Sequence, residues 1–204
     1  MKELREKLGR RQFLGISALA TSSAALGTRT ASAATPPKRT GRPYMKLSLA
    51  AYSFNRLLKR RAPLEELANA EMRLEDCVDY CAELDLDGCE PTSYYFPETV
   101  TQDYVLALKE QAFRLGLDIS GTAIGNDFGL PYGEKRDAQL AMTREWIEHA
   151  ALLGAPVIRI FAGNTPAGDT DTAAIDRCVE GINESLEHAA KLGVFLALEN
   201  HGGI

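Results

Sequence analysis

A leucine–glycine pair that returns at nearly constant spacing is the feature that most restricts the fold of this chain. The pairs begin at Leu115, Leu153 and Leu192, 38 and 39 residues apart. Each pair closes an amphipathic helical pattern and opens an apolar run. A glycine in the left-handed conformation ends a helix, and the leucine before it packs the last turn. A repeated helix–stop–strand unit of about 40 residues predicts a parallel α/β sheet.

The apolar runs predict five strands, which we place at Lys46–Ser53, Gly88–Pro91, Leu117–Thr122, Pro156–Phe161 and Val194–Glu199. Helical periodicity predicts two amphipathic helices before the last two strands. The apolar faces of these helices are predicted to hold Met142, Trp146, His149, Ala150 and Leu153 in the first, and Ile175, Val179, Ile182, Leu186 and Ala189 in the second. Thr170 or Asp171 is a suitable N-cap for the second helix.

The alternation of side chains along the strands separates two architectures, a doubly wound sheet and a (β/α)₈ barrel. Ile158 and Ile160 alternate with Arg159, and Leu198 precedes Glu199. One aliphatic face and one polar face suit a barrel with helices outside and a polar mouth. The glycine spacing after the third strand, at Gly121, matches neither phosphate-binding pattern of open sheets. The pattern therefore favours the barrel.

The length from Met45 to Ile204 suits an incomplete barrel. A complete barrel needs about 250 residues, and this stretch supplies 160. We expect about five βα units, with parallel strands and outer helices, and we interpret the chain as an N-terminal fragment.

The first 44 residues carry export signals rather than fold signals. Arg10-Arg11-Gln12-Phe13-Leu14 resembles a twin-arginine signal, and Ala31-Ser32-Ala33 has the pattern of a cleavage site. We therefore expect a signal peptide over 1–33, a linker over 34–44 and the partial barrel over 45–204. The twin-arginine export machinery is then a partner, and the location is periplasmic or extracellular. The apolar part of the signal is too short and polar to span a membrane stably.

The charge of the chain argues against nucleic acid as a partner. The formal charge is −5, and cleavage after residue 33 removes six basic and two acidic residues, which lowers it to −9. An acidic domain repels phosphate backbones. The four cysteines lack metal-ligand spacing, and we expect them to be free, buried thiols.

The last strand ends in the most informative group of polar residues. After the apolar run from Val194 to Leu198 come Glu199, Asn200 and His201. Polar side chains at the carboxyl ends of parallel strands form the site in such folds. Glu199 is the first candidate, and His201 is predicted to contact substrate or orient Glu199.

Other candidates follow the remaining strands, and each has a structural alternative. Glu90 is predicted to bind substrate hydroxyls, or to end its strand with a solvated carboxylate. Tyr94, with Tyr95, suits an apolar platform for a sugar, or simple loop packing. Asn126 and Asn164 are predicted polar substrate contacts on rim loops, although asparagine is common in turns. Arg159 is expected inside the barrel, paired with Asp118 or Glu199.

Several stretches together resemble the xylose-isomerase-like TIM-barrel family of sugar phosphate isomerases and epimerases. They are Asp87–Pro97, Leu117–Asn126, Ala155–Asn164 and Leu198–Gly203, in the family's order. The resemblance implies a divalent metal ion (Mn, Mg, Co or Zn) at the barrel mouth, held by a Glu, an Asp, a His and a second Glu after strands five to eight. Of these ligands only the first has a match here, Glu199, so the site is incomplete in this chain.

The resemblance implies isomerisation or epimerisation of a sugar or sugar derivative. The metal polarises a carbonyl, and a carboxylate moves the neighbouring proton through an enediolate. Glu199 and His201 are the predicted catalytic residues, and we expect this chain to be inactive by itself. The alternative is a non-catalytic, sugar-binding or remnant barrel without a complete metal site. An abasic-site endonuclease on the same fold would need more histidines and a basic face.

Overall fold

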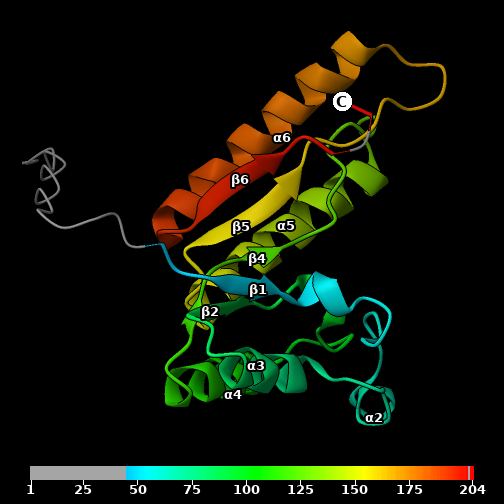
Figure 1. The fold of residues 1–204 in the computed structure, drawn as a ribbon. Helices are drawn as coiled ribbons and strands as arrows, with labels where there is room; N and C mark the ends of the chain where they lie inside the picture. The colour runs from blue at the N-terminus through cyan, green and yellow to red at the C-terminus, as the bar shows by residue number, and fades with distance from the viewer. Residues whose placement is uncertain (1–44, 202) are drawn as a thin grey trace, which may run out of the picture. The chain divides into compact units, whose positions relative to one another are not determined.

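A computed structural model describes residues 45–201, 203 and 204, which are all but one residue of the predicted barrel portion. The predicted signal peptide and linker, at 1–33 and 34–44, lie outside the described residues. Within 45–204 the chain alternates strands and helices as an incomplete (β/α)₈ barrel (Figure 1).

The elements follow one another in a simple order. The strands are β1 (Ser48–Ala50), β2 (Gly88–Glu90), β3 (Asp118–Ile119), β4 (Thr122–Ala123), β5 (Val157–Phe161) and β6 (Phe195–Glu199). The α-helices are α2 (Leu64–Leu67), α3 (Leu74–Glu83), α4 (Gln102–Arg114), α5 (Glu134–Leu153) and α6 (Asp171–Leu192), and two short 3₁₀ helices are η1 (Ala51–Phe54) and η2 (Ser93–Tyr95).

All described strand pairs are parallel, in the orders β1-β2-β3 and β4-β5-β6. Each of the four long helices contacts the strand that follows it, and neighbouring helices pack side by side. In Figure 1, α3 and α4 lie along β1 and β2, whereas α5 and α6 lie along β5 and β6. This is the right arrangement for a wall of strands with helices on its outer face.

The third predicted strand differs from expectation because it changes partner halfway. Asp118 and Ile119 pair with β2, and Thr122 and Ala123 pair with β5. Between them, a Cβ on Gly121 would lie 3.0 Å from a methyl group of Val157. The absence of a side chain therefore lets the strand bend against β5.

The first predicted strand was too long at its carboxyl end. The chain leaves β1 after Ala50 and turns into η1, where Tyr52 O accepts a hydrogen bond from the Asn55 amide at 3.1 Å, and Phe54 O then accepts from the amides of Leu57 and Leu58. These turn hydrogen bonds replace a continued strand over Ala51–Ser53.

The predicted strand faces are confirmed where helices cover them. Ile158 and Ile160 are 0% and 1% exposed beneath the helices, while Arg159 lies on the opposite face. Leu198, also predicted to face outward, is 58% exposed because β6 is an edge strand among the described residues.

The burial of α6 differs from the predicted apolar face. Ile175, Val179 and Leu186 remain between 41% and 52% exposed. The helix instead buries small residues, and a Cβ on Gly181 would lie 3.0 Å from the Phe128 ring. The helix α6 therefore turns its face of small residues toward Phe128. The predicted N-cap is confirmed, since the Thr170 hydroxyl accepts a hydrogen bond from the Ala173 amide at 3.2 Å.

The predicted helix α5 and the cysteines agree with the sequence analysis. Trp146, Ala150 and Leu153 are buried, and Trp146 packs edge-on to Phe96. All four cysteines are free and buried. Burial raises the pKa of the Cys77 and Cys89 thiols to about 12, so both are neutral at physiological pH.

No helix in the described part of the chain has the length and apolar character needed to cross a membrane.

The three leucine–glycine helix stops have the geometry that the repeat predicted. Gly116, Gly154 and Gly193 all have positive φ. At Gly193, with φ 71°, a Cβ would meet no atom within 4 Å. The substitution Gly193→Ala should therefore cost only the strain of a left-handed backbone, about 1–2 kcal/mol, as measured by urea unfolding.

Gly193→Asn is the matched control, because asparagine tolerates this conformation better than alanine. Equal losses of unfolding free energy for the two variants would show that backbone conformation is not why glycine stands there.

Candidate functional site

A cavity of about 670 Å³ opens at the carboxyl ends of the strands. The residues that line it are Tyr52, Arg60, Glu90, Tyr94, Gly125, Arg159, Phe161, Glu199 and His201. Glu90, Phe161 and Glu199 are the last residues of β2, β5 and β6. Strand ends place these groups at one mouth because all the strands run in the same direction.

A smaller cavity, of about 380 Å³, lies at the amino ends of the strands. It is lined by residues that include Lys46, Asp118 and Ser120, and Lys46 forms an ion pair with Asp118. Asp118 is therefore not the partner of Arg159. Because strand-end sites lie at the carboxyl ends, the larger cavity is the candidate site.

Arg159 lines the larger cavity and contacts several of the residues around it. Its Nε lies 3.0 Å from Oε2 of Glu199, which confirms the second of the two predicted partners. Its Nη1 donates to the carbonyl oxygen of Ile124 at 2.6 Å, and its Nη2 donates to the hydroxyl of Tyr94 at 3.3 Å. The guanidinium carbon also lies 3.9 Å from the centre of the Phe161 ring.

The two members of this ion pair are held unequally. The Arg159 side chain is 21% exposed and has the three further contacts, whereas the Glu199 side chain is 44% exposed. Arg159 can therefore stay in place without Glu199, while the Glu199 carboxylate remains accessible from the cavity.

Glu90 supplies a second carboxyl group to the cavity, and the pKa of this group is raised. Burial is the main reason that its pKa is raised, the charge of Glu199 raises it further, and Arg159 opposes both. A carboxyl group with a raised pKa exchanges a proton nearer to neutral pH than an ordinary one.

Tyr94 lies where the sequence predicted a sugar platform. Its ring packs edge-on against Tyr52, with centroids 6.3 Å apart, and the Arg60 guanidinium carbon lies 5.2 Å from its centroid. A Cβ on Gly125 would lie 3.0 Å from the Tyr94 hydroxyl oxygen. The glycine therefore makes room for the position of this ring.

His201 lies beside Glu199, as the sequence predicted. Its ring stacks on Phe161, with centroids 4.9 Å apart, and its Nδ1 is 3.7 Å from Oε1 of Glu199. The distance exceeds a hydrogen bond, so the imidazole faces the carboxylate without fixing it.

The two predicted asparagines do not line the cavity. Asn126 is 3% exposed, and its side-chain amide exchanges two hydrogen bonds with the backbone of Phe161, at 2.7 and 2.9 Å. The Asn164 side chain donates to Asp127 at 3.3 Å. Both amides join the loops after β4 and β5, so their predicted contact with substrate gains no support from this geometry.

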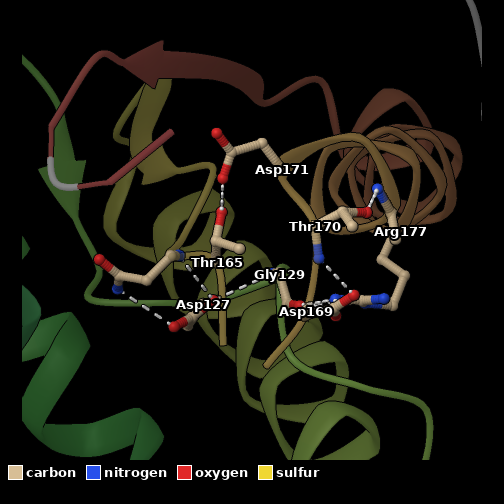
Figure 2. A network of polar contacts seen from close by, with 9 residues as sticks. Asp127, Gly129, Thr165, Asp169, Thr170, Asp171 and Arg177 are labelled. Atoms are coloured by element: carbon tan, nitrogen blue, oxygen red, sulfur yellow. Dashed lines mark hydrogen bonds and ion pairs between the residues drawn. The ribbon is translucent and has the colours of Figure 1, made fainter. Parts of the chain in front are cut away.

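Further polar contacts fix the same two loops. Figure 2 shows Asp127 accepting a hydrogen bond from the Gly129 amide, and Arg177 held between Asp169 and the Gly129 carbonyl oxygen. The hydroxyl of Thr165, in the loop after β5, donates to Asp171 at 2.6 Å. These contacts tie the start of α6 to the loop after β4.

Sequence reasoning missed Arg60 and Phe161 as cavity residues. The signal for Arg60 was the basic run Lys59-Arg60-Arg61 after the first strand. Phe161 was predicted only as the end of a strand, although that position itself faces the mouth.

The described residues contain no cluster of three or more His, Cys, Asp or Glu side chains that could hold a metal ion. Glu199 and His201 are a carboxylate and an imidazole at one rim, which are the donor types that divalent metals of this kind accept. The two residues therefore fit as part of a metal site and need further ligands.

Parallel strands, outer helices and a charged mouth define a barrel of the (β/α) class. The Xylose isomerase-like TIM barrel family matches residues 78–203, which is more than half of the chain. The chain belongs to this family.

Solved structures with the same fold include several sugar epimerases. D-Psicose 3-epimerase from Clostridium cellulolyticum H10, solved with D-tagatose, is 17% identical with a TM-score of 0.58; the match covers 76% of this chain and 52% of that one. A xylose isomerase domain protein from Planctomyces limnophilus is 18% identical with a TM-score of 0.53, and the match covers 78% of this chain and 55% of that one. 3-Keto-D-glucoside 4-epimerase from E. coli is 17% identical with a TM-score of 0.52, and the match covers 62% of this chain and 50% of that one.

The chain thus spans about half the length of the solved structures that it matches. No curated protein matches it. At these identities the structural likeness establishes the fold.

Because Glu199 is more exposed than Arg159, we expect the ion pair between them to contribute only a small coupling free energy that salt reduces. In a double-mutant cycle of Arg159→Gln and Glu199→Gln, the coupling free energy should be about 1 kcal/mol or less, because Glu199 is partly exposed to solvent. It should decrease in 1 M NaCl, measured by urea unfolding. A coupling of several kcal/mol that salt leaves unchanged would instead identify Glu199 as a buried structural partner.

The raised pKa of Glu90 predicts a pH-dependent cost of folding. A carboxyl group whose pKa is higher in the folded state contributes most to stability when protonated, below its ordinary value of 4.5. That contribution is lost as pH rises through the folded-state pKa. The stability of Glu90→Gln relative to the wild type should therefore increase across this range in unfolding experiments.

Glu98→Gln is a matched control, because Glu98 is an exposed carboxylate that does not line the cavity. A flat difference between the wild type and Glu90→Gln would contradict the raised pKa.

Proposed function

We propose that this chain supplies one wall of the site of a metal-dependent isomerase or epimerase that acts on a sugar or sugar derivative. The observation that carries the proposal is the position of Glu199, whose partly exposed carboxylate ends β6 and faces the cavity that Glu90 and Arg159 also line. The family relationship and the sugar epimerases with the same fold support this reaction class.

Each residue of the cavity has a role in the proposed reaction. Glu199, with His201 beside it, would hold a divalent cation, together with ligands that the family resemblance places after later strands. When bound, the cation would polarise the sugar carbonyl. Glu90, with its raised pKa, suits proton exchange with a substrate hydroxyl or the carbon next to the carbonyl. The Tyr94 ring offers an apolar face to the sugar.

The second candidate is a non-catalytic sugar-binding barrel. It is favoured by the Arg159–Glu199 ion pair, which occupies the one carboxylate that matches a family ligand. In this case the cavity would bind sugar without a metal ion.

Export by the twin-arginine pathway to the periplasm or beyond belongs to the proposal as well. It is supported by Arg10-Arg11 and Ala31-Ser32-Ala33 alone, which precede the described residues.

Metal binding distinguishes the two candidate functions. The 204-residue chain should bind Mn²⁺ weakly in calorimetric titrations, since it offers only part of a ligand set. Glu199→Gln should lower the affinity by more than about tenfold, since even residues that merely support a ligand cost 10–100-fold. Arg159→Gln should raise the affinity, because it frees the carboxylate from its competing cation.

Asp118→Asn removes an exposed carboxylate at the opposite end of the strands and is the control. Mn²⁺ binding that Glu199→Gln leaves unchanged would contradict the proposed metal site and favour the non-catalytic alternative.

A further inference from the structure

Arg60 differs from the other charged residues of the cavity because it has no ion-pair partner among the described residues. Arg159 is paired with Glu199, whereas the Arg60 guanidinium lies over the face of the Tyr94 ring, 5.2 Å from its centroid. The side chain lines the cavity and is exposed to solvent. It is a cation at the mouth whose hydrogen-bond donors remain available.

The neighbouring arginine, Arg61, points away from the cavity and is held by other contacts. Arg61 donates through Nη2 to the carbonyl oxygen of Glu98 at 2.7 Å, and its guanidinium lies 5.6 Å from the centre of the Trp146 ring. Its amide also donates to Tyr94 O at 2.8 Å. Arg61 thus anchors the segment to the barrel wall, and the chain direction leaves Arg60 at the cavity.

Tyr94, which carries Arg60, is itself held in place. Its hydroxyl accepts a hydrogen bond from Arg159 at 3.3 Å, and its ring packs edge-on against Tyr52 and Tyr95. A guanidinium on a fixed aromatic face loses less conformational freedom when it binds an anion than a free surface arginine does.

Among the charged residues that line the cavity, Arg60 is the arginine without an ion-pair partner in the described part of the chain. The Arg159 and Glu199 charges cancel within their ion pair. The charge of Arg60 is left unmatched, on a chain whose formal net charge is −5.

We infer that the cavity takes a sugar derivative carrying an anionic group, a carboxylate or a phosphate, and that Arg60 binds this group. This inference rests on the proposed function and narrows its substrate class. The planar guanidinium matches both anions through two parallel N–H donors. A cavity of about 670 Å³ has room for a sugar with such a group. A neutral sugar could accept hydrogen bonds from Arg60 but would leave its charge without a counter-ion.

The test compares three ligands with one skeleton: D-fructose, D-fructuronate and D-fructose 6-phosphate. Affinities for the full 204-residue chain are measured by calorimetry or ligand-observed NMR. The wild type should bind at least one of the anionic ligands about tenfold more tightly than D-fructose, which is about 1.4 kcal/mol. The preference should fall as NaCl increases. The anion that is preferred identifies the carboxylate or the phosphate as the group that Arg60 recognises.

Two variants separate a specific contact from general charge attraction. Arg60→Gln should remove most of the preference, because it should weaken binding of the anionic ligands far more than binding of D-fructose. Arg56→Gln makes the same charge change at a nearby exposed arginine that does not line the cavity, and should leave the preference intact.

The outcomes distinguish failure of this inference from failure of the proposed function. Equal affinity for neutral and anionic sugars would overturn the inference while sugar binding stands. An equal loss of preference in Arg56→Gln and Arg60→Gln would overturn it as well, because attraction would then be nonspecific. Absence of binding for all three sugars would contradict the proposed function and this inference with it.

Discussion

The candidate site depends on one partly buried cation, Arg159. Arg159 projects from the middle of β5 into the barrel interior, where an unpaired charge is costly. Glu199, the Ile124 carbonyl oxygen and the Tyr94 hydroxyl all meet its guanidinium, so each of its neighbours is positioned by the same group. Through these contacts Arg159 connects β5 to the end of β6, the end of β4 and the loop after β2. The residues around it form one unit rather than independent side chains at separate strand ends.

The loops around this unit are supported from the outer side by polar contacts and by close packing. Asn126 takes the place of a strand partner for Phe161, and Arg177 joins the start of α6 to Gly129. Gly129 and Gly163 lie where a side chain would overlap other atoms, since a Cβ on either would come within 2.3 Å of a neighbouring atom. The rim therefore owes its arrangement to backbone groups and small residues, which allows the charged side chains to remain in the cavity.

The sequence predicted most of the fold because the physical signals were local. The left-handed glycines, the N-cap at Thr170 and the alternation around Arg159 each depend on a few neighbouring residues. The features that the sequence predicted wrongly depend on contacts between residues far apart in the chain. The bend at Gly121 reflects contact with Val157, and the inward face of α6 reflects contact between Gly181 and Phe128.

The same distinction explains the site. Glu199, His201, Glu90 and Tyr94 follow strands, so their place at the mouth could be predicted from the strands alone. Arg60 lies in an irregular segment whose course is set by Arg61 and its hydrogen bonds to Tyr94 and Glu98. Asn126 sits at the end of a strand too, yet its amide is occupied by Phe161. Strand-end position indicates where a side chain begins but not which hydrogen bonds it makes.

These contacts also relate stability to function at the mouth. If Glu199 binds a cation through Oε2, that oxygen leaves Arg159, and the cost of the exchange depends on what Arg159 retains. Because the guanidinium keeps the Ile124 carbonyl oxygen, the Tyr94 hydroxyl and the Phe161 ring, it is not left without partners. Glu199 in turn is exposed enough to be solvated during the exchange. The ion pair can therefore preserve the shape of the mouth without a cation and yield its carboxylate when one binds.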